Sequence, residues 1–249
     1  AAPIDSLLIK IGARPSSGDI RAIEGMPRGA ERKAAAWNAL VNVASSSQQP
    51  FVELAQKLQN SGVIDGYETL VSPNMIVVDP KSGRAREVMA AFQAIQGVRA
   101  IYDNRGAEIT DPSAAGHPAV SDEPTWGLDL GEPGATGKGL VYGSIDTGAD
   151  FNHEAIAGAY RGRAQDGTVT HDYNWMDWGN GRSDKPRDPD SHGTHTIGTV
   201  LGKTDAAPIG VAPEAQWISA HGLTGNADVR LKALQWMQAP TKLDGSAPE

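Results

Sequence analysis

Two stretches of the sequence carry residue types and a spacing that could do chemistry. Asp146 follows an apolar run at 139–145 and begins the tripeptide Asp146-Thr147-Gly148. His192 lies in the segment 190–199, DSHGTHTIGT, where small residues follow the imidazole. An imidazole held by a carboxylate can act as a general base, because the carboxylate orients the ring and stabilises the imidazolium formed in the reaction. The two stretches therefore predict an acid–base pair.

The elements around these stretches are expected to bring the pair together. Apolar runs and helical spacing predict two strands and two helices in alternation, over residues 139–145, 191–201, 216–220 and 228–239. Alternating strands and helices indicate a parallel sheet covered by helices, and side chains at the carboxyl ends of such strands share one edge. We therefore expect Asp146 and His192 to meet there, although 46 positions separate them.

The first part of the chain has a different organisation. We predict a strand, a helical stretch broken near Ser45–Pro50, two strands, a helix and a final strand, over residues 6–14, 37–58, 67–71, 75–79, 84–96 and 98–102. This β-α-β-β-α-β order is the ferredoxin-like arrangement. Residues 106–125, rich in Pro, Ala and Ser, have no apolar period and are expected to form a surface linker.

Composition narrows the function classes. The 249 residues have a net charge of −8 and include no Cys, which excludes disulfides and a cysteine nucleophile in this chain. Residues 1–105 carry 12 Lys and Arg against 10 Asp and Glu, whereas residues 106–249 carry 10 against 20. Neither part has the basic excess of a duplex-DNA binder, and no run approaches the ~20 apolar residues of a membrane helix.

Three spaced motifs resemble the signatures of subtilisin-like serine proteases (peptidase S8): IDTG at 145–148, SHGTHTIGT at 191–199 and IGVAPEAQWISA at 209–220. Their order fits the subtilisin order Asp, His, Ser. The resemblance implies the subtilisin-like parallel-sheet α/β fold, with Asp146 as the triad acid and His192 as the general base. It also implies that His195 is a packed supporting residue. Residues 126–162 and 226–240 resemble the bacillopeptidase F-like branch of this family.

The same resemblance implies a precursor. Subtilisin-like enzymes are often made behind a ferredoxin-like propeptide of the inhibitor I9 type, which assists folding and inhibits the active site. We therefore expect a propeptide at 1–105, a linker with the processing region at 106–125 and the N-terminal part of the catalytic domain at 126–249. The N-terminal Ala1-Ala2-Pro3 fits removal of a signal peptide, so we expect secretion, with the periplasm as the alternative location.

One departure from the family pattern affects activity. The family's nucleophile lies in a Gly-Thr-Ser-Met-Ala type of motif, and no Gly-Thr-Ser occurs in this sequence. The Asn of the oxyanion hole is also absent, and such a donor is worth about 3–4 kcal/mol of the barrier. We expect this chain alone to be inactive, with the serine beyond Glu249 or on a separate C-terminal fragment.

Two other functions stay open on the sequence. The chain could be a non-catalytic propeptide and half-domain that acts as a protease inhibitor or folding module. Asp146-Thr147-Gly148 also matches the Asp-Thr-Gly of aspartic proteases, which need two carboxylates and would here require a dimer. The expected partners are protein or peptide substrates and the chain's own propeptide, with neither nucleic acid nor membrane.

Weaker signals concern ligands. His192 and His195, together with Asp190, are a candidate metal site, but a third strong ligand is not evident. No cofactor is certain from the sequence. The acidic loop 177–190 could hold Ca²⁺, with a solvated turn as the alternative. Gly225 and Asn226 are expected either to line the cleft that binds extended substrate or to form a turn before the next helix.

Overall fold

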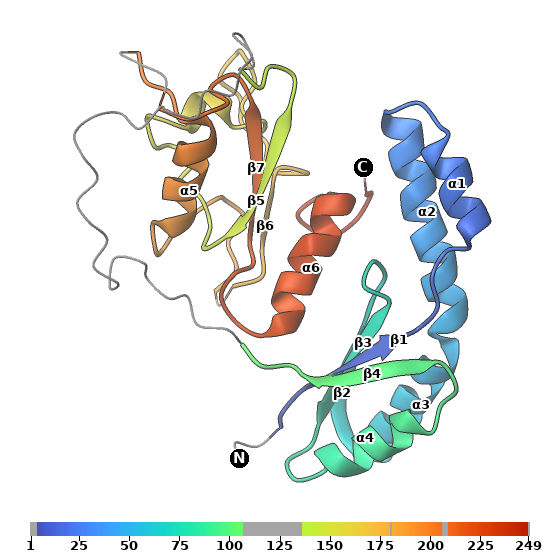
Figure 1. Cartoon of the computed structure of the whole chain (residues 1–249). Coiled ribbons are helices and arrows are strands. Elements are labelled where there is room, and N and C mark those ends of the chain that lie inside the picture. Colours follow the sequence, from blue (N-terminus) through green and yellow to red (C-terminus); the bar gives the residue numbers. More distant parts are fainter. Residues whose placement is uncertain (1–3, 107–135, 180, 206–208, 249) are drawn as a thin grey trace, which may run out of the picture. The chain divides into compact units, whose positions relative to one another are not determined.

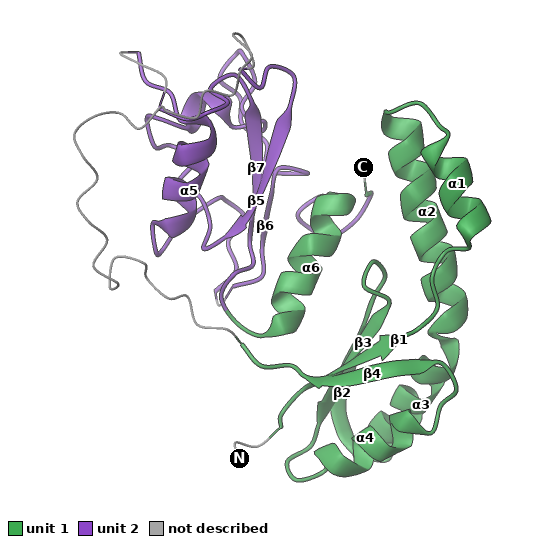
Figure 2. Ribbon diagram, viewed as in Figure 1, with its two compact units in different colours: residues 1–106, 225–240, 248–249 green, residues 107–224, 241–247 purple. Residues whose placement is uncertain are grey.

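The computed structural model describes residues 4–106, 136–179, 181–205 and 209–248. The chain divides into two compact units, coloured separately in Figure 2. Unit 1 contains residues 1–106, 225–240 and 248–249, and unit 2 contains residues 107–224 and 241–247.

Unit 1 is built on a four-stranded antiparallel sheet of order β2-β3-β1-β4 (Figure 1). Its elements in chain order are β1 (Leu7–Ile11), α1 (Ser17–Glu24), α2 (Ala30–Ser47), α3 (Gln49–Asn60), β2 (Ile64–Leu70), β3 (Met75–Pro80), α4 (Ala85–Gln93), β4 (Val98–Asp103) and, from the later part of the chain, α6 (Ala227–Gln238). The strands and their order agree with the expected β-α-β-β-α-β arrangement, and the helical stretch breaks at Gln48 as predicted.

Helix α1 was not predicted from the sequence. It begins with a capping box, in which the Ser16 side chain accepts from the backbone of Asp19 while the Asp19 carboxylate accepts from the backbone of Ser16. The helix buries no residue. Its two isoleucines, Ile20 and Ile23, have the spacing of one helical face, but the sequence analysis did not use this single pair. The polar cap was the signal that could have found it.

Each face of the unit 1 sheet packs on helices. Ile9 and Ile11, with the other inward residues of β1 and β3, form a buried core with Phe51 of α3 and Phe92 of α4. On the opposite face, Leu8, Leu70 and Val77 pack against Ala227 and Leu231 of α6. The alternation of side chains along a strand explains how one sheet supports both contacts.

Unit 2 holds a parallel sheet of order β5-β7-β6, made of β5 (Val141–Asp146), β6 (Trp175–Asp177) and β7 (Gln216–His221). A 3₁₀ turn, η2 (Ala157–Ala159), precedes β6, and helix α5 (His192–Leu201) follows it. Ile197 and Leu201 of α5 share a buried core with Tyr160 and Trp217. The parallel α/β fold is as expected, whereas the three-residue β6 was missed because so short a strand has no readable period.

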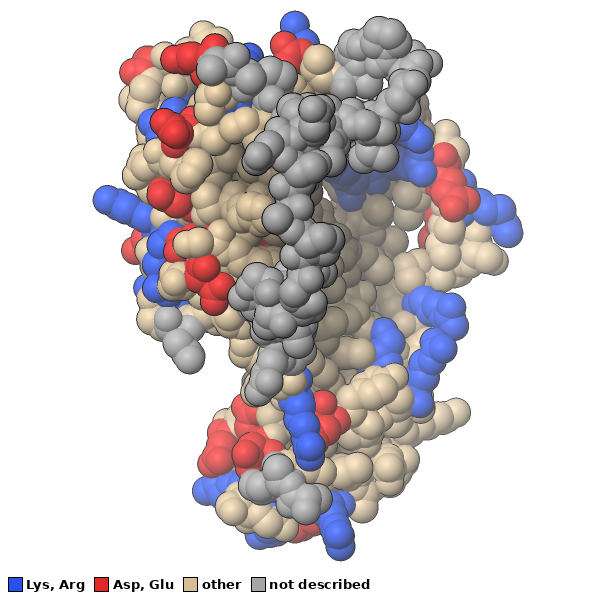
Figure 3. All heavy atoms as spheres, turned by 60° about the vertical axis from the view of Figure 1, so that its left-hand side comes forward, with Lys and Arg blue, Asp and Glu red and all other residues tan. Residues whose placement is uncertain are grey.

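The remaining features of the fold are the distribution of charge on the surface and the character of the helices. Figure 3 shows acidic and basic side chains interspersed in small groups on the face that it presents. Among the described residues, none of the helices combines the length and the apolar character needed to span a membrane.

Candidate active site

The predicted acid–base pair is brought together in unit 2. Asp146 is the last residue of β5 and His192 is the first residue of α5. The His192 Nδ1 lies 2.6 Å from the Asp146 Oδ1. The same carboxylate accepts a hydrogen bond from the Thr147 amide at 2.7 Å, and its second oxygen lies 3.1 Å from the Thr196 hydroxyl. The carboxylate is therefore held on both oxygens.

The surroundings of the pair favour an imidazole that can take up a proton. The hydrogen bond that His192 donates to Asp146 raises the pKa of His192. Partial burial opposes this rise, and the charges of Asp146, Asp190 and Asp188 add to it. The side chain of His192 is 33% exposed and that of Asp146 only 10%. Because Nδ1 faces the carboxylate, Nε2 is the free edge, and among the described residues it has no hydrogen-bond partner.

Glycines let the helix approach the end of β5. The Gly193 amide donates to the Thr147 hydroxyl at 3.0 Å. A Cβ on Gly193 would lie 2.1 Å from the carbonyl oxygen of Gly148, far inside contact distance. The small residue beside His192 thus allows the imidazole and the carboxylate to come within hydrogen-bond reach.

Asp188 positions the start of α5, a role that the sequence analysis missed. Ser191, the N-cap residue, has φ 67° and makes no side-chain cap bond. Asp188 instead accepts from the Ser191 amide at 3.0 Å, from the Thr194 amide at 2.7 Å and from the hydroxyls of Thr194 and Thr147 at 2.6 and 2.8 Å. An Asp shortly before a helix is a capping signal, which the acidic composition of the loop obscured.

The hydrogen bonds also control the charge of Asp188. Burial alone would raise the pKa of this carboxyl, but the bonds from Thr194 and Thr147 outweigh it and lower the pKa below its ordinary value. Asp188 is therefore a carboxylate at neutral pH. Its charge lies at the positive end of the α5 dipole, where it stabilises the helix.

A second carboxylate–imidazole pair lies beside the first. Asp146 and His221 are register partners on β5 and β7, and His221 pairs in turn with Asp177 on β6. The Nδ1 of His221 lies 2.9 Å from Asp177, and its Nε2 lies 2.9 Å from the Thr224 hydroxyl. Because both ring nitrogens are engaged and the side chain is only 5% exposed, this histidine has a structural role.

The structure describes most of the residues that the sequence analysis considered as metal ligands. Among the described residues, no group of three or more His, Cys, Asp or Glu side chains could hold a metal ion. In the loop 177–190, the carboxylates of Asp177 and Asp188 are engaged by hydrogen bonds from protein groups. His195 is exposed on α5, and the expectation that it packs beneath the site is wrong.

Gly225 and Asn226 belong to unit 1, whereas Asp146 and His192 belong to unit 2. Both residues are exposed. Gly225 has φ 98°, and Asn226 occupies the N-cap position of α6 without a side-chain cap bond. The backbone of Gly106 runs close by, since a Cβ there would lie 2.8 Å from the Gly225 carbonyl oxygen.

Comparison with known proteins relates part of the chain to one protein family. Residues 137–242 match the sequence profile of the Subtilase family, Peptidase_S8. The chain is 28% identical over 237 residues to Bacillopeptidase F of Bacillus subtilis (strain 168), an alignment that covers 87% of this chain and 16% of that protein. It is 32% identical over 144 residues to Subtilisin-like protease 1 of Arthroderma otae, covering 52% of this chain and 26% of the relative.

Residues 137–242, called the subtilase-family segment below, are therefore similar to the subtilase family. The chain spans less than a third of the length of the curated relatives it matches, from 16% to 26% in these two cases. The resemblance of residues 126–162 and 226–240 to the bacillopeptidase F-like branch agrees with the first of them.

Proposed function

We propose that this chain is the N-terminal part of the precursor of a secreted subtilisin-like serine endopeptidase, with Asp146 and His192 as two members of a Ser-His-Asp triad. The observation that carries the proposal is the 2.6 Å contact between the two side chains, with Nε2 of the imidazole left free. Because the Asp146 carboxylate is bonded to an imidazole rather than to a second carboxylate, the geometry favours serine over aspartic protease chemistry.

In the proposed reaction, a serine outside residues 1–249 attacks the carbonyl of a peptide bond. Nε2 of His192 accepts the hydroxyl proton, and Asp146 stabilises the resulting imidazolium. His192 then gives that proton to the leaving amine, which breaks the C–N bond and leaves an acyl-enzyme. Water, deprotonated by the same imidazole, releases the acid and restores the serine. Gly225 and Asn226 are proposed to contact the extended peptide substrate.

We further propose that residues 1–105 are the propeptide and that 106–125 contain the processing region, which lies outside the described residues apart from Gly106. Helix α6 supports this assignment, because it belongs to the subtilase-family segment yet packs in unit 1 on the sheet formed by residues 1–105. Gln235 of α6 accepts hydrogen bonds from the amides of Val71 at 2.6 Å and Ser72 at 3.1 Å.

Processing of the complete protein tests the proposal. His192→Ala should abolish cleavage within 106–125, measured by mass spectrometry of the secreted protein, and should abolish labelling by a fluorophosphonate serine probe. His195→Ala is the matched control, because it removes an exposed imidazole from the same helix and should leave both readouts unchanged. Normal processing in His192→Ala would show that the triad assignment is wrong.

A second candidate is a protease inhibitor or folding module without catalysis of its own. The packing of the unit 1 sheet on α6 favours it equally, because that contact requires no serine. This candidate predicts that residues 1–105 bind a mature relative tightly. Absence of binding at about micromolar concentration, together with fluorophosphonate labelling of the complete protein, would exclude it.

A further inference from the structure

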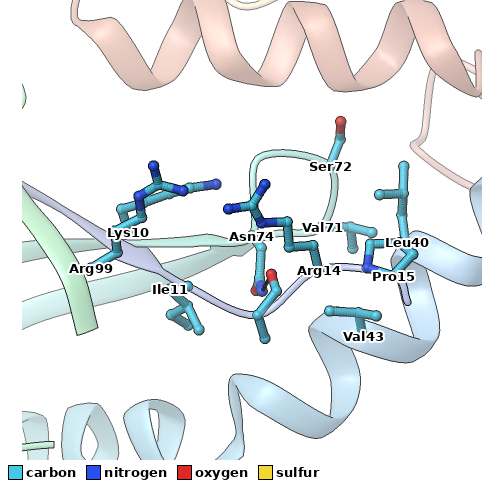
Figure 4. Close-up of a pocket in the computed structure, with 12 residues that line it drawn as sticks. Lys10, Ile11, Arg14, Pro15, Leu40, Val43, Val71, Ser72, Asn74 and Arg99 are labelled. Carbon is cyan, nitrogen blue, oxygen red and sulfur yellow. Dashed lines mark hydrogen bonds between the residues drawn. The ribbon is translucent and has the colours of Figure 1, made fainter. Parts of the chain in front are cut away.

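Unit 1 contains a pocket whose lining residues lie in β1, the segment after β1, α2, the β2–β3 turn and β4 (Figure 4). Its volume is about 230 Å³. Sites for drug-sized ligands run from roughly 300 to 1,000 Å³, so a ligand of this pocket would have to be small. No residue of the subtilase-family segment lines it.

Three cationic side chains gather on one side of the pocket. Lys10 and Arg99 lie together, and Arg14 reaches toward them from the segment after β1 (Figure 4). Lys10 is directed to this side because its neighbours Ile9 and Ile11 point into the core. Among the described residues, no Asp or Glu forms an ion pair with any of the three.

The pKa of Lys10 is lowered by its burial and by the nearby positive charges. Burial is the largest cause, and the charges of Arg99 and then Arg14 lower the pKa further. Its ammonium donates to the carbonyl oxygen of Pro73, a neutral acceptor that does not balance the charge. Arg14 and Arg99 are exposed, so water screens part of the repulsion among the three charges. The repulsion that remains raises the free energy of the folded protein, and an anion in the pocket would reverse that effect.

The remaining lining includes an apolar wall and a fixed turn. Leu40 and Val43 of α2 line the pocket together with Pro15. Asn74, which has φ 45°, donates its side-chain amide to the Ala13 carbonyl at 3.0 Å and so ties the β2–β3 turn to the segment after β1. The pocket thus combines a cationic side with an apolar wall on a braced backbone.

We propose that this pocket binds a small multivalent oxyanion on an organic group, a phosphate ester or a di- or tricarboxylate. Arg guanidinium groups match phosphate and carboxylate oxygens in pairs, and Lys adds a compact point charge. The apolar wall accepts the carbon part of the ligand. The proposal is independent of the protease function, because the pocket and the Asp146–His192 pair share no residue.

Calorimetric titration of the full 249-residue chain at low ionic strength tests this. The probes are glycerol phosphate for the phosphate source, citrate for the carboxylate source and glycerol as the uncharged comparison. One of the two anions should bind with a 1:1 stoichiometry, and glycerol should not. Arg14→Gln/Arg99→Gln should weaken that binding at least about tenfold, whereas Arg86→Gln, an exposed arginine on α4, should not change it.

A melting measurement separates a binding role from a structural one. Without ligand, the double variant should melt no lower than the parent chain, because the substitutions remove like-charge repulsion, and its anion-dependent rise in Tm should disappear. Lack of binding of both anions at about 10 mM, or equal binding by parent and double variant, would overturn the proposal.

Discussion

Replacing Asp188 by Asn should weaken the start of α5 and thereby the candidate active site. The carboxylate accepts from the amides of Ser191 and Thr194 and from the hydroxyls of Thr194 and Thr147 at 2.6–3.0 Å. Asn keeps one acceptor oxygen and turns an NH₂ group toward the other donors. Hydrogen bonds to a charged group contribute about 1.5–3 kcal/mol each. Because Asp188 is only half-buried, we expect a loss of about 2–3 kcal/mol in all.

The loss should depend on pH in a defined direction. The pKa of Asp188 is held below its ordinary value of 3.8, so its carboxylate stabilises the folded state fully above that value. This contribution disappears as the pH falls through the folded-state pKa. The difference between parent and Asp188→Asn should therefore be constant near neutrality and shrink in acid.

Amide hydrogen exchange at Ile197 and Leu201, both buried in α5, measures this stability residue by residue. Asp190→Asn is the matched control, because it makes the same chemical change on an exposed side chain two positions away and should cost under about 0.5 kcal/mol. Equal protection in the parent and in Asp188→Asn, or a difference that grows in acid, would refute the capping role.

Three further predictions concern unit 2. Asp146→Asn should lower the pKa of His192, because the hydrogen bond to the Asp146 carboxylate is the main cause of its rise; an unchanged NMR titration of the imidazole would contradict this. Gly193→Ala should destabilise by about 1–3 kcal/mol through overlap with a backbone oxygen, whereas Gly198→Ala, with open space around it, should stabilise α5 by about 0.5–1 kcal/mol. Urea unfolding would show whether the two signs differ. Asp177→Asn should cost about 3–5 kcal/mol, because it breaks a buried charged network; a loss under about 1 kcal/mol in the same assay would disprove that network's importance.

Much of the fold could be predicted because local patterns determine it. The strand expected within residues 6–14 is β1, and its residues Leu7, Ile9 and Ile11 lie in the core. Two short elements were missed: α1, whose apolar face consists of one isoleucine pair and buries no residue, and β6, which has three residues. Helix α1 begins with a capping box and β6 is held by pairing with β7. Neither interaction produces a periodic pattern in the sequence.

The sequence by itself determined the chemistry of the candidate site. Asp146 after an apolar strand and His192 at a helix start are local features of the sequence. In a parallel sheet both positions lie at the same carboxyl edge, so their side chains are expected to be close. Their contact at 2.6 Å agrees with that expectation.

Only the tertiary structure decided what depends on partners distant in the chain. Helical periodicity showed that α6 has an apolar face but not that this face packs on the sheet of unit 1. Acidic composition could not distinguish a helix cap at Asp188 from a metal ligand or a solvated turn, because the hydrogen-bond donors around the carboxylate make that difference. Lys10, Arg14 and Arg99 come from two separate segments, and their shared positive field exists only after the sheet has paired β1 with β4.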